Sequence, residues 1–298
     1  MRRRSLLVVL QLLLPGYALP SDGSAQAGLV QSDQVQIGNC DYSAVPGVIW
    51  YGVERQMTIQ RFAEYAAPIF WFSMDEPSMD YRRGKQVRVP EPLPFEDAPD
   101  APVVYYQFNT IYTRTDGDGP GFVSSDDKAG SIIDFHNVAV INLKYIAYFA
   151  EEEGLGGHAH DVEPAEFRLW IARAGSEALA EELEEIGYSV RCDRPMYVVG
   201  VSRISAEAHG LQWFWNVLEV DRYTQFPFTL TVEEGKHGLC TDKNGDGVYT
   251  PGYDVNVRIN DAWGLRDIIR GGTLFTGKFE AWMAKNRYLE HRVFPPLP

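Results

Sequence analysis

The chain has 298 residues, of which 45% are hydrophobic and 23% are charged. This composition is that of a globular protein and excludes a collagen-like or largely disordered chain. Lys and Arg number 27 against 41 Asp and Glu, which gives a formal net charge of −14. Such a charge repels a phosphate backbone, so we expect no nucleic-acid partner.

The first 27 residues have the pattern of an export signal. Three arginines follow Met1, a short apolar run ends at Pro15, and Ala25-Gln26-Ala27 supplies the small residues of a cleavage site. The apolar run is too short for a membrane-spanning helix. We therefore expect a signal peptide at 1–27, a secreted or periplasmic protein, and no transmembrane segment after processing.

The following elements are expected from the spacing of apolar residues. A helix is predicted over 57–67 and a buried strand over 68–72, before a proline-rich connection over 82–102. From there on, segments rich in Val, Ile, Tyr, Phe and Trp predict strands. These strands are 103–113, 132–149, 165–174, 196–207, 212–220, 227–234 and 253–260.

Only a few helices are expected among these strands. An acidic amphipathic helix is predicted over 176–186, and a helical C-terminal tail over 263–269 and 275–286. Strands do not alternate with helices as they do around a parallel sheet, so two packed antiparallel sheets are favoured. The sequence predicts an all-β, jelly-roll-like β-sandwich with a few peripheral helices, as one domain over 28–298.

Three cysteines lie in the predicted mature chain, namely Cys40, Cys192 and Cys240. Two of them can pair in an oxidising compartment, and the sequence does not choose among the three pairings. Three thiols cannot form a four-cysteine zinc site, so a structural zinc of that type is excluded.

The segment with the most chemistry follows an aromatic strand and a glycine-rich loop. It carries His158, Asp161 and Glu163 within six residues, with the acidic run 151–153 just before the loop. On an extended strand Asp161 and Glu163 point to the same face. Imidazole and carboxylate ligands together suit a hard divalent cation better than zinc. A solvated polar turn is the alternative interpretation.

Gly157-His158-Ala159-His160-Asp161-Val162-Glu163 resembles the Gly-His-Arg-His-Asp-Trp-Glu signature of the necrosis-inducing cytolysins, which are secreted β-jelly-roll proteins. Ala159 and Val162 differ from that signature. The resemblance implies that His158, Asp161, Glu163 and, from upstream, Glu152 surround a divalent cation, Mg²⁺ or Ca²⁺, in a surface cavity.

Three shorter patches agree with this resemblance. Residues 61–77 and the Gly-Lys-His-Gly segment 235–238 resemble parts of the related vacuolar protein sorting sixty-two family, and 205–210 resembles a later cytolysin segment. The histidines of these patches, His209 and His237, follow strands and precede glycine. We expect them, with His160, as possible members of the same cavity, although a histidine at a strand end is more often structural.

A second ion site is expected over 242–254. The segment Asp-Lys-Asn-Gly-Asp-Gly has alternating oxygen ligands and a glycine at position 6, as in a calcium loop. Tyr253 stands where such a loop has glutamate, and Asp254 is its substitute. An Asn-Gly or Asp-Gly hairpin turn is the alternative. The predicted calcium ligands are Asp242, Asn244, Asp246, Val248, Thr250 and Asp254.

Three functions are compatible with these features. The first is a secreted metal-binding protein, cytolysin-like, that engages a lipid headgroup or a glycan. The second is a secreted metal-dependent hydrolase of phosphate or ester substrates, for which no catalytic residue is identified. The third is a calcium-stabilised envelope protein whose ions hold only the fold.

Overall fold

Strands dominate the protein, as the runs of Val, Ile, Tyr and Phe predict. The computed structural model describes residues 35–73, 90, 103–124, 130–151, 159–206, 216–232, 237–246, 253–254, 257–258, 279–283 and 290–293. These ranges contain two helices, α1 (Ile59–Ala66) and α2 (Glu177–Glu185). The all-β prediction is confirmed. The predicted signal peptide at 1–27 lies outside the described residues.

Seventeen strands run through the described part of the chain. They are β1 (Val35–Ile37), β2 (Val48–Gly52), β3 (Gln56–Thr58), β4 (Ile69–Ser73), β5 (Val103–Thr113), β6 (Phe122–Val123), β7 (Ile132–Asp134), β8 (Val138–Glu151), β9 (Ala159–Arg173), β10 (Tyr188–Val190), β11 (Tyr197–Ala206), β12 (Asn216–Glu219), β13 (Thr229–Val232), β14 (Leu239–Asp242), β15 (Val257–Arg258), β16 (Phe279–Met283) and β17 (Glu290–Val293).

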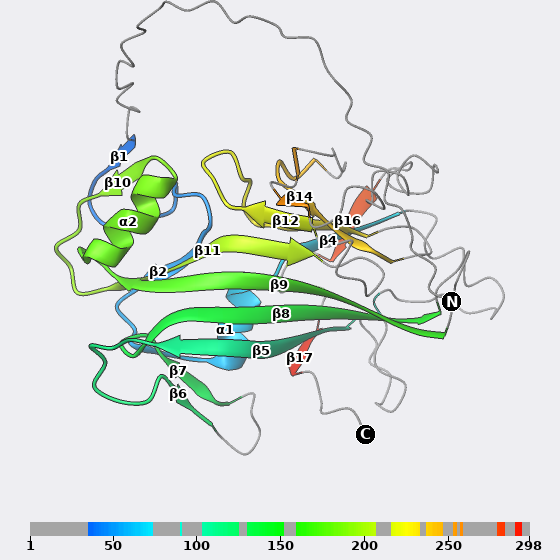
Figure 1. The fold of residues 1–298 in the computed structure, drawn as a ribbon, viewed down its shortest axis with the longest axis horizontal. Helices are drawn as coiled ribbons and strands as arrows, with labels where there is room; N and C mark the ends of the chain where they lie inside the picture. Colours follow the sequence, from blue (N-terminus) through cyan, green and yellow to red (C-terminus); the bar gives the residue numbers. More distant parts are fainter. Residues whose placement is uncertain are drawn as a thin grey trace, which may run out of the picture. The chain divides into compact units, whose positions relative to one another are not determined.

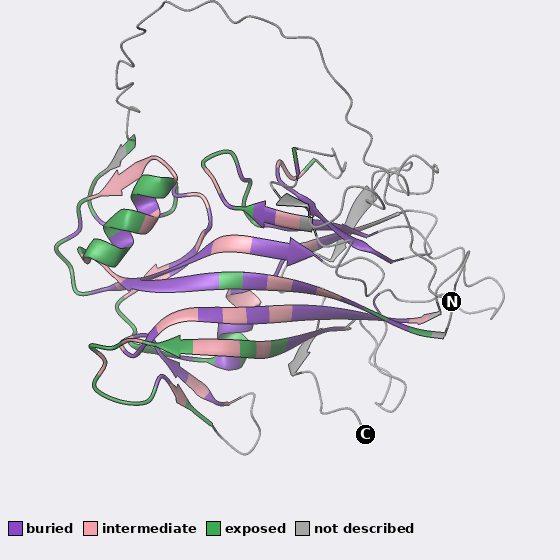
Figure 2. Ribbon diagram, viewed as in Figure 1, coloured by how far each residue is buried: buried purple, intermediate pink, exposed green. Residues whose placement is uncertain are grey.

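The largest sheet has eight strands in the order β15-β12-β11-β9-β8-β5-β17, with β2 also paired to β11. Its long central strands β5, β8, β9 and β11 are antiparallel neighbours and lie side by side in Figure 1. Buried and partly exposed residues alternate from Ile141 to Tyr145 of β8 (Figure 2), because successive side chains of a strand point to opposite faces, whereas Tyr145 to Phe149 are all buried.

A second sheet has four strands in the order β14-β13-β4-β16 and shares its core with the first. Phe70 of β4 and Leu230 of β13 belong to the same buried cluster as Tyr145 and Phe167 of the large sheet. The rings of Phe167 and Phe228 lie 6.0 Å apart, centroid to centroid. A common core between two sheets is what a β-sandwich requires. The jelly-roll topology itself stays a prediction.

The strand pattern of the sequence predicts two antiparallel sheets, but the sheets also contain parallel pairs. Strand β4 pairs parallel with β13, and β5 pairs parallel with β17. Parallel neighbours need long connections between them, and these strand pairs are indeed far apart in the chain. Apolar alternation identifies a strand but says nothing of its direction relative to its neighbour.

Helix α1 covers part of the core. Ile59, Phe62, Ala63 and Ala66 are buried at helical spacing, and the Thr58 hydroxyl caps the first turn by accepting from the Arg61 N–H at 3.3 Å. The helix was expected over 57–67, but it begins later because Gln56–Thr58 forms β3 and pairs with β7.

The predicted helical tail is wrong over part of its length. Residues Phe279–Met283 form strand β16, which pairs antiparallel with β4, whereas 263–269 lies outside the described residues. Apolar residues at 279, 281 and 283 suit a strand as well as a helix, and pairing with β4 decides between the two. A single-sequence pattern does not contain that tertiary contact.

Cys40 and Cys192 form a disulfide, which chooses one of the three pairings that the sequence left open. It lies in a second buried cluster with Tyr42, Leu179 and Leu183, beneath helix α2. The two strands of the parallel pair β1–β10 end a few residues before Cys40 and Cys192, respectively. Cys240 is buried in β14 and is not part of this disulfide. No helix among the described residues is long and apolar enough to cross a membrane.

Gly200 lies opposite Trp170 in the β9–β11 pair, and the indole of Trp170 occupies the space that a side chain at position 200 would need. A Cβ at Gly200 would lie 2.1 Å from Cζ2 of Trp170, which is 7% exposed. We expect Gly200→Ala to destabilise the protein by about 1–3 kcal/mol through overpacking and to lower Tm by roughly 5 °C in thermal unfolding. Gly38→Ala is the control, since nothing lies within 4 Å of its Cβ. Equal melting of both variants would contradict the prediction.

Candidate functional site

Asp161 and Glu163 lie on the core-facing side of β9, as the alternation predicts. Their relative exposures are 6% and 1%, whereas Val162 between them is 38% exposed. The same row continues inward with Ala165 and Phe167, both of which belong to the hydrophobic core. Two acidic side chains thus occupy the end of an otherwise apolar row. Burial of ionised carboxylates requires compensating charge or hydrogen bonds.

Among the described strands, β9 has a partner on only one of its edges at these two acids. It pairs with β11 only from Ala165 onward, whereas it pairs with β8 from Ala159 to Trp170. Pro164 is the first residue past the end of the β11 pairing, where a missing backbone N–H is tolerated. Within the described ranges, Asp161 and Glu163 therefore lie where the large sheet narrows to the β8–β9 hairpin.

His237 reaches Asp161 from the segment that leads into β14 of the second sheet. It directly precedes the β14 region, and its ring stacks on Phe149 of β8 with centroids 3.8 Å apart and planes at 3°. Phe149 is the cross-strand partner of Asp161. The stacked ring places its Nδ1 3.3 Å from Asp161 Oδ2. Buried at 4% exposure, His237 brings the two sheets together at one site.

The backbone of His237 is held in the left-handed region, with φ +58°. This conformation is uncommon for a residue other than glycine, and it persists where the surrounding structure fixes it. Gly238 follows, so the chain can turn directly into β14. The turn orients the imidazole of His237 toward Asp161. The two residues are therefore in contact although they are 76 residues apart in the sequence.

The site offers two carboxylates and one imidazole, which are ligands for a hard divalent cation. Among the described residues, however, no group of three or more His, Cys, Asp or Glu side chains is arranged to hold a metal ion. The other two predicted ligands, Glu152 and His158, lie outside the described residues. The donor types present fit a cation, and a complete ligand set is not formed by Asp161, Glu163 and His237 alone.

Of the other two histidines expected as possible cavity members, only His160 lies among the described residues. His160 is exposed, and its backbone is in the left-handed region at φ +65°. Its Nδ1 lies 2.6 Å from the hydroxyl of Tyr148, which is the cross-strand partner of Val162 and not of Asp161. The structure thus places His160 at Tyr148 and not beside the two acids. His209 lies outside the described residues.

The predicted calcium loop is described over 242–246, which turn directly after β14, and over 253–254. Asp242 Oδ1 accepts from the Asp246 N–H at 3.2 Å, and Asp254 Oδ1 accepts from the Lys243 N–H at 2.9 Å. Gly245 adopts φ +67°, as position four of this turn requires. Asp242 and Asp254 are buried, and Asn244 donates to Asp246 at 2.7 Å. Val248 and Thr250 lie outside the described residues, and bound calcium stays a prediction.

We expect calcium to stabilise the folded protein through this loop. At calcium concentrations near 100 times Kd, binding to the folded state adds about 2.7 kcal/mol, or roughly 5–10 °C in Tm. Differential scanning fluorimetry with calcium and with a chelator measures the shift. Asp242→Asn should abolish it, whereas Asp193→Asn, an exposed acid outside the loop, should retain it. An unchanged Tm in both solutions would show that the loop is only a turn.

One polar network was not expected from the sequence. Arg55 donates from Nε to Asp134 at 2.9 Å and from Nη2 to Asp118 at 2.7 Å, and the bond to Arg55 lowers the pKa of Asp118. Nearby, His136 contacts the Tyr197 hydroxyl at 3.2 Å. The network lies near the start of β8, whereas Asp161 pairs with its end. Arg55 and Asp118 are 63 residues apart, so no local pattern could reveal the contact.

No protein-family model, curated protein or solved structure matches the chain. The resemblance to the cytolysins therefore stays a hypothesis, carried by the residues of the 157–163 segment.

Proposed function

We propose that this protein is an exported β-sandwich that binds a divalent cation, Mg²⁺ or Ca²⁺, at Asp161 and Glu163. The observation that carries the proposal is the burial of both carboxylates on one face of β9, with His237 in contact with Asp161. Glu152 and His158 complete the proposed ligand set.

Electrostatics support a cation at this place. Two carboxylates two residues apart on one strand face repel each other when both are ionised, and burial adds to the unfavourable free energy. A divalent ion between them offsets both effects. The imidazole of His237 is a neutral ligand or an orienting partner of Asp161, and its stacking on Phe149 restricts its rotation.

The proposed role of the bound ion is to engage a lipid headgroup or a glycan at a surface. The chain carries a formal net charge of −14 and is repelled by anionic membranes. A cation coordinated by the protein can bridge to phosphate or sugar oxygens that the acidic surface alone does not attract. The resemblance to the cytolysins supports the same role and, with the predicted signal peptide, a secreted or periplasmic location.

We expect Asp161→Asn to weaken divalent-cation binding by about 100-fold or more. Even mutation of residues that only hydrogen-bond to metal ligands lowers metal affinity about 10–100-fold, and Asp161 is proposed as a ligand itself. Isothermal titration calorimetry with CaCl₂ and with MgCl₂ measures this. Glu166→Gln is the matched control, because Glu166 lies on the same strand and its carboxylate contacts Asn109 instead, at 2.8 Å. Equal affinity in the parent and Asp161→Asn would overturn the site.

Vesicle and activity assays separate the three functions. Cosedimentation with phosphatidylserine vesicles that needs calcium, and is lost in Asp161→Asn, supports the lipid arm of the proposal; glycan arrays test the other arm. Turnover of p-nitrophenyl phosphate that is lost in the same variant would favour the hydrolase instead. Cation binding that only raises Tm, without any association, would favour the structural envelope protein.

A further inference from the structure

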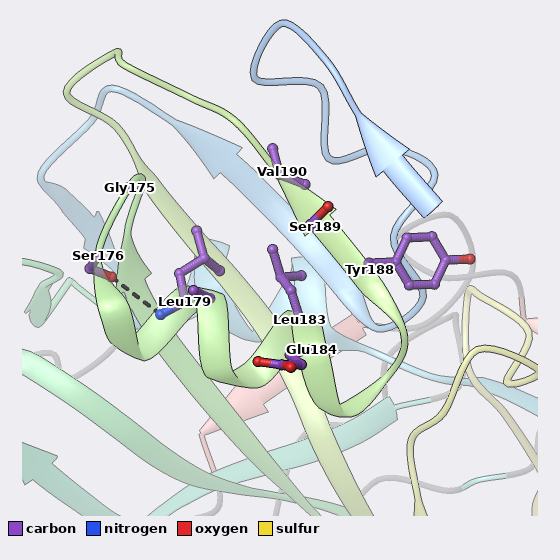
Figure 3. A pocket seen from close by; sticks show the side chains of 9 residues that line it. Gly175, Ser176, Leu179, Leu183, Glu184, Tyr188, Ser189 and Val190 are labelled. Carbon is purple, nitrogen blue, oxygen red and sulfur yellow. Dashed lines mark hydrogen bonds between the residues drawn. The ribbon is translucent and has the colours of Figure 1, made fainter. Parts of the chain in front are cut away.

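A groove lies between helix α2 and strand β10 (Figure 3); α2 follows the end of β9, whereas Asp161 and Glu163 lie near the start of that strand. Its volume is about 270 Å³. Leu179, Leu183 and Val190 contribute apolar side chains to it, with Ala180 from the outer side of the helix. The Ser176 hydroxyl at one end is already engaged, because it caps α2 by accepting from the Leu179 N–H at 3.3 Å. The groove is therefore apolar inside and has room for one or two side chains.

The helix beside the groove is strongly acidic. α2 has the sequence EALAEELEE and carries no Lys or Arg. Glu184 lines the groove and is exposed. Burial, followed by the charge of Glu185, raises the pKa of Glu182, so neighbouring carboxylates on this helix disfavour each other's ionised form. A positively charged ligand relieves this repulsion.

Strand β10 has an unused edge. It hydrogen-bonds to β1 in a two-stranded parallel sheet, and its other side pairs with no strand in the described part of the chain. Ser189 and Val190 of this strand line the groove. An open strand edge beside an apolar groove is the arrangement that recruits an extended peptide by strand addition.

We propose that the groove between α2 and β10 is a docking site for an extended, basic segment of a partner protein. The segment pairs with the free edge of β10 and inserts an aliphatic side chain against Leu179, Leu183 and Val190. Lysine or arginine side chains on either side of this anchor pair with Glu184 and its acidic neighbours. This charge complementarity selects a basic segment over a neutral or acidic one.

Fluorescence anisotropy of the full chain with a labelled Lys-Leu-Lys-Val-Lys peptide tests the proposal, and Glu-Leu-Glu-Val-Glu is the control probe. We expect only the basic peptide to bind. Ala180→Trp, which fills the groove from an exposed helix position, should weaken binding at least about tenfold. Ala178→Trp, an exposed position of the same helix outside the groove, should not. Equal Tm values of the two variants exclude loss of fold as the cause.

Charge reversal separates the groove from a general attraction to the acidic helix. Glu184→Lys should weaken binding roughly tenfold at low salt, since it turns one exposed attraction into a repulsion. Glu185→Lys, next to it but outside the groove, should weaken binding less than about threefold. Equal losses in both variants with an unchanged Ala180→Trp would overturn the proposal. So would self-association of the parent that Ala180→Trp abolishes, because a second copy would then be the occupant.

Discussion

Replacing Cys40 and Cys192 together by serine is expected to lower the free energy of unfolding by about 4 kcal/mol and Tm by about 10 °C. The disulfide closes a loop with a sequence separation of 152, so it removes many conformations from the unfolded chain. It also lies within the buried cluster under α2, which includes Trp170 and Ala172 of β9 and Val198 of β11. Urea titration and thermal unfolding measure both quantities.

Reductant provides the control for this expectation. Dithiothreitol should lower the Tm of the parent by a similar amount and leave that of Cys40→Ser/Cys192→Ser unchanged, since Cys240 is outside the disulfide. A parent protein that melts alike with and without reductant would contradict the stabilising role of the bond. The disulfide forms in an oxidising compartment, in agreement with the proposed export.

Phe167→Ala is expected to destabilise the protein by about 4 kcal/mol, within the range for deletion of a large aromatic core side chain. Phe167 of β9 is fully buried, and its ring packs edge-on against Tyr145 at 5.3 Å and against Phe228 at 6.0 Å. Deletion leaves a cavity between the large sheet and the segment that leads into β13. Chemical denaturation measures the loss.

Tyr112→Ala is the matched control, because Tyr112 is an aromatic residue of β5 that is 55% exposed. Its effect should stay below about 1 kcal/mol. A double-mutant cycle of Phe167 with Phe228 should give a coupling free energy of about 0.5–1.5 kcal/mol. No coupling between them would contradict the packing of the two sheets across a common core.

Sequence periodicity correctly predicted those helices and strands that depend mainly on residues close together in the chain. Strand β5 matches the expected 103–113 at both ends, and α2 lies within one residue of 176–186. The shared orientation of Asp161 and Glu163 followed from the two-residue period of a strand. These features depend on neighbours in sequence, for which the pattern is sufficient.

Features that depend on distant contacts were not predictable in the same way. His237 was expected only as a possible cavity residue, and its contact with Asp161 results from the packing of one sheet on the other. The pairing of Cys40 with Cys192 and the strand at 279–283 likewise depend on partners far away in the chain. A residue's own neighbours carry no information about such partners.

The sheet pairings also determine when during synthesis this chain can fold. β2 pairs with β11, β4 with β13 and β5 with β17, so three strands from the first 113 residues have partners that are made much later. Such a high contact order requires large loops to close before the pairings stabilise the structure, which makes folding slow. β2 and β4 stay without these partners until the late strands emerge, whereas β5 can pair earlier with β8. We therefore expect the edges of β2 and β4 to need protection from aggregation until β11 and β13 have been made.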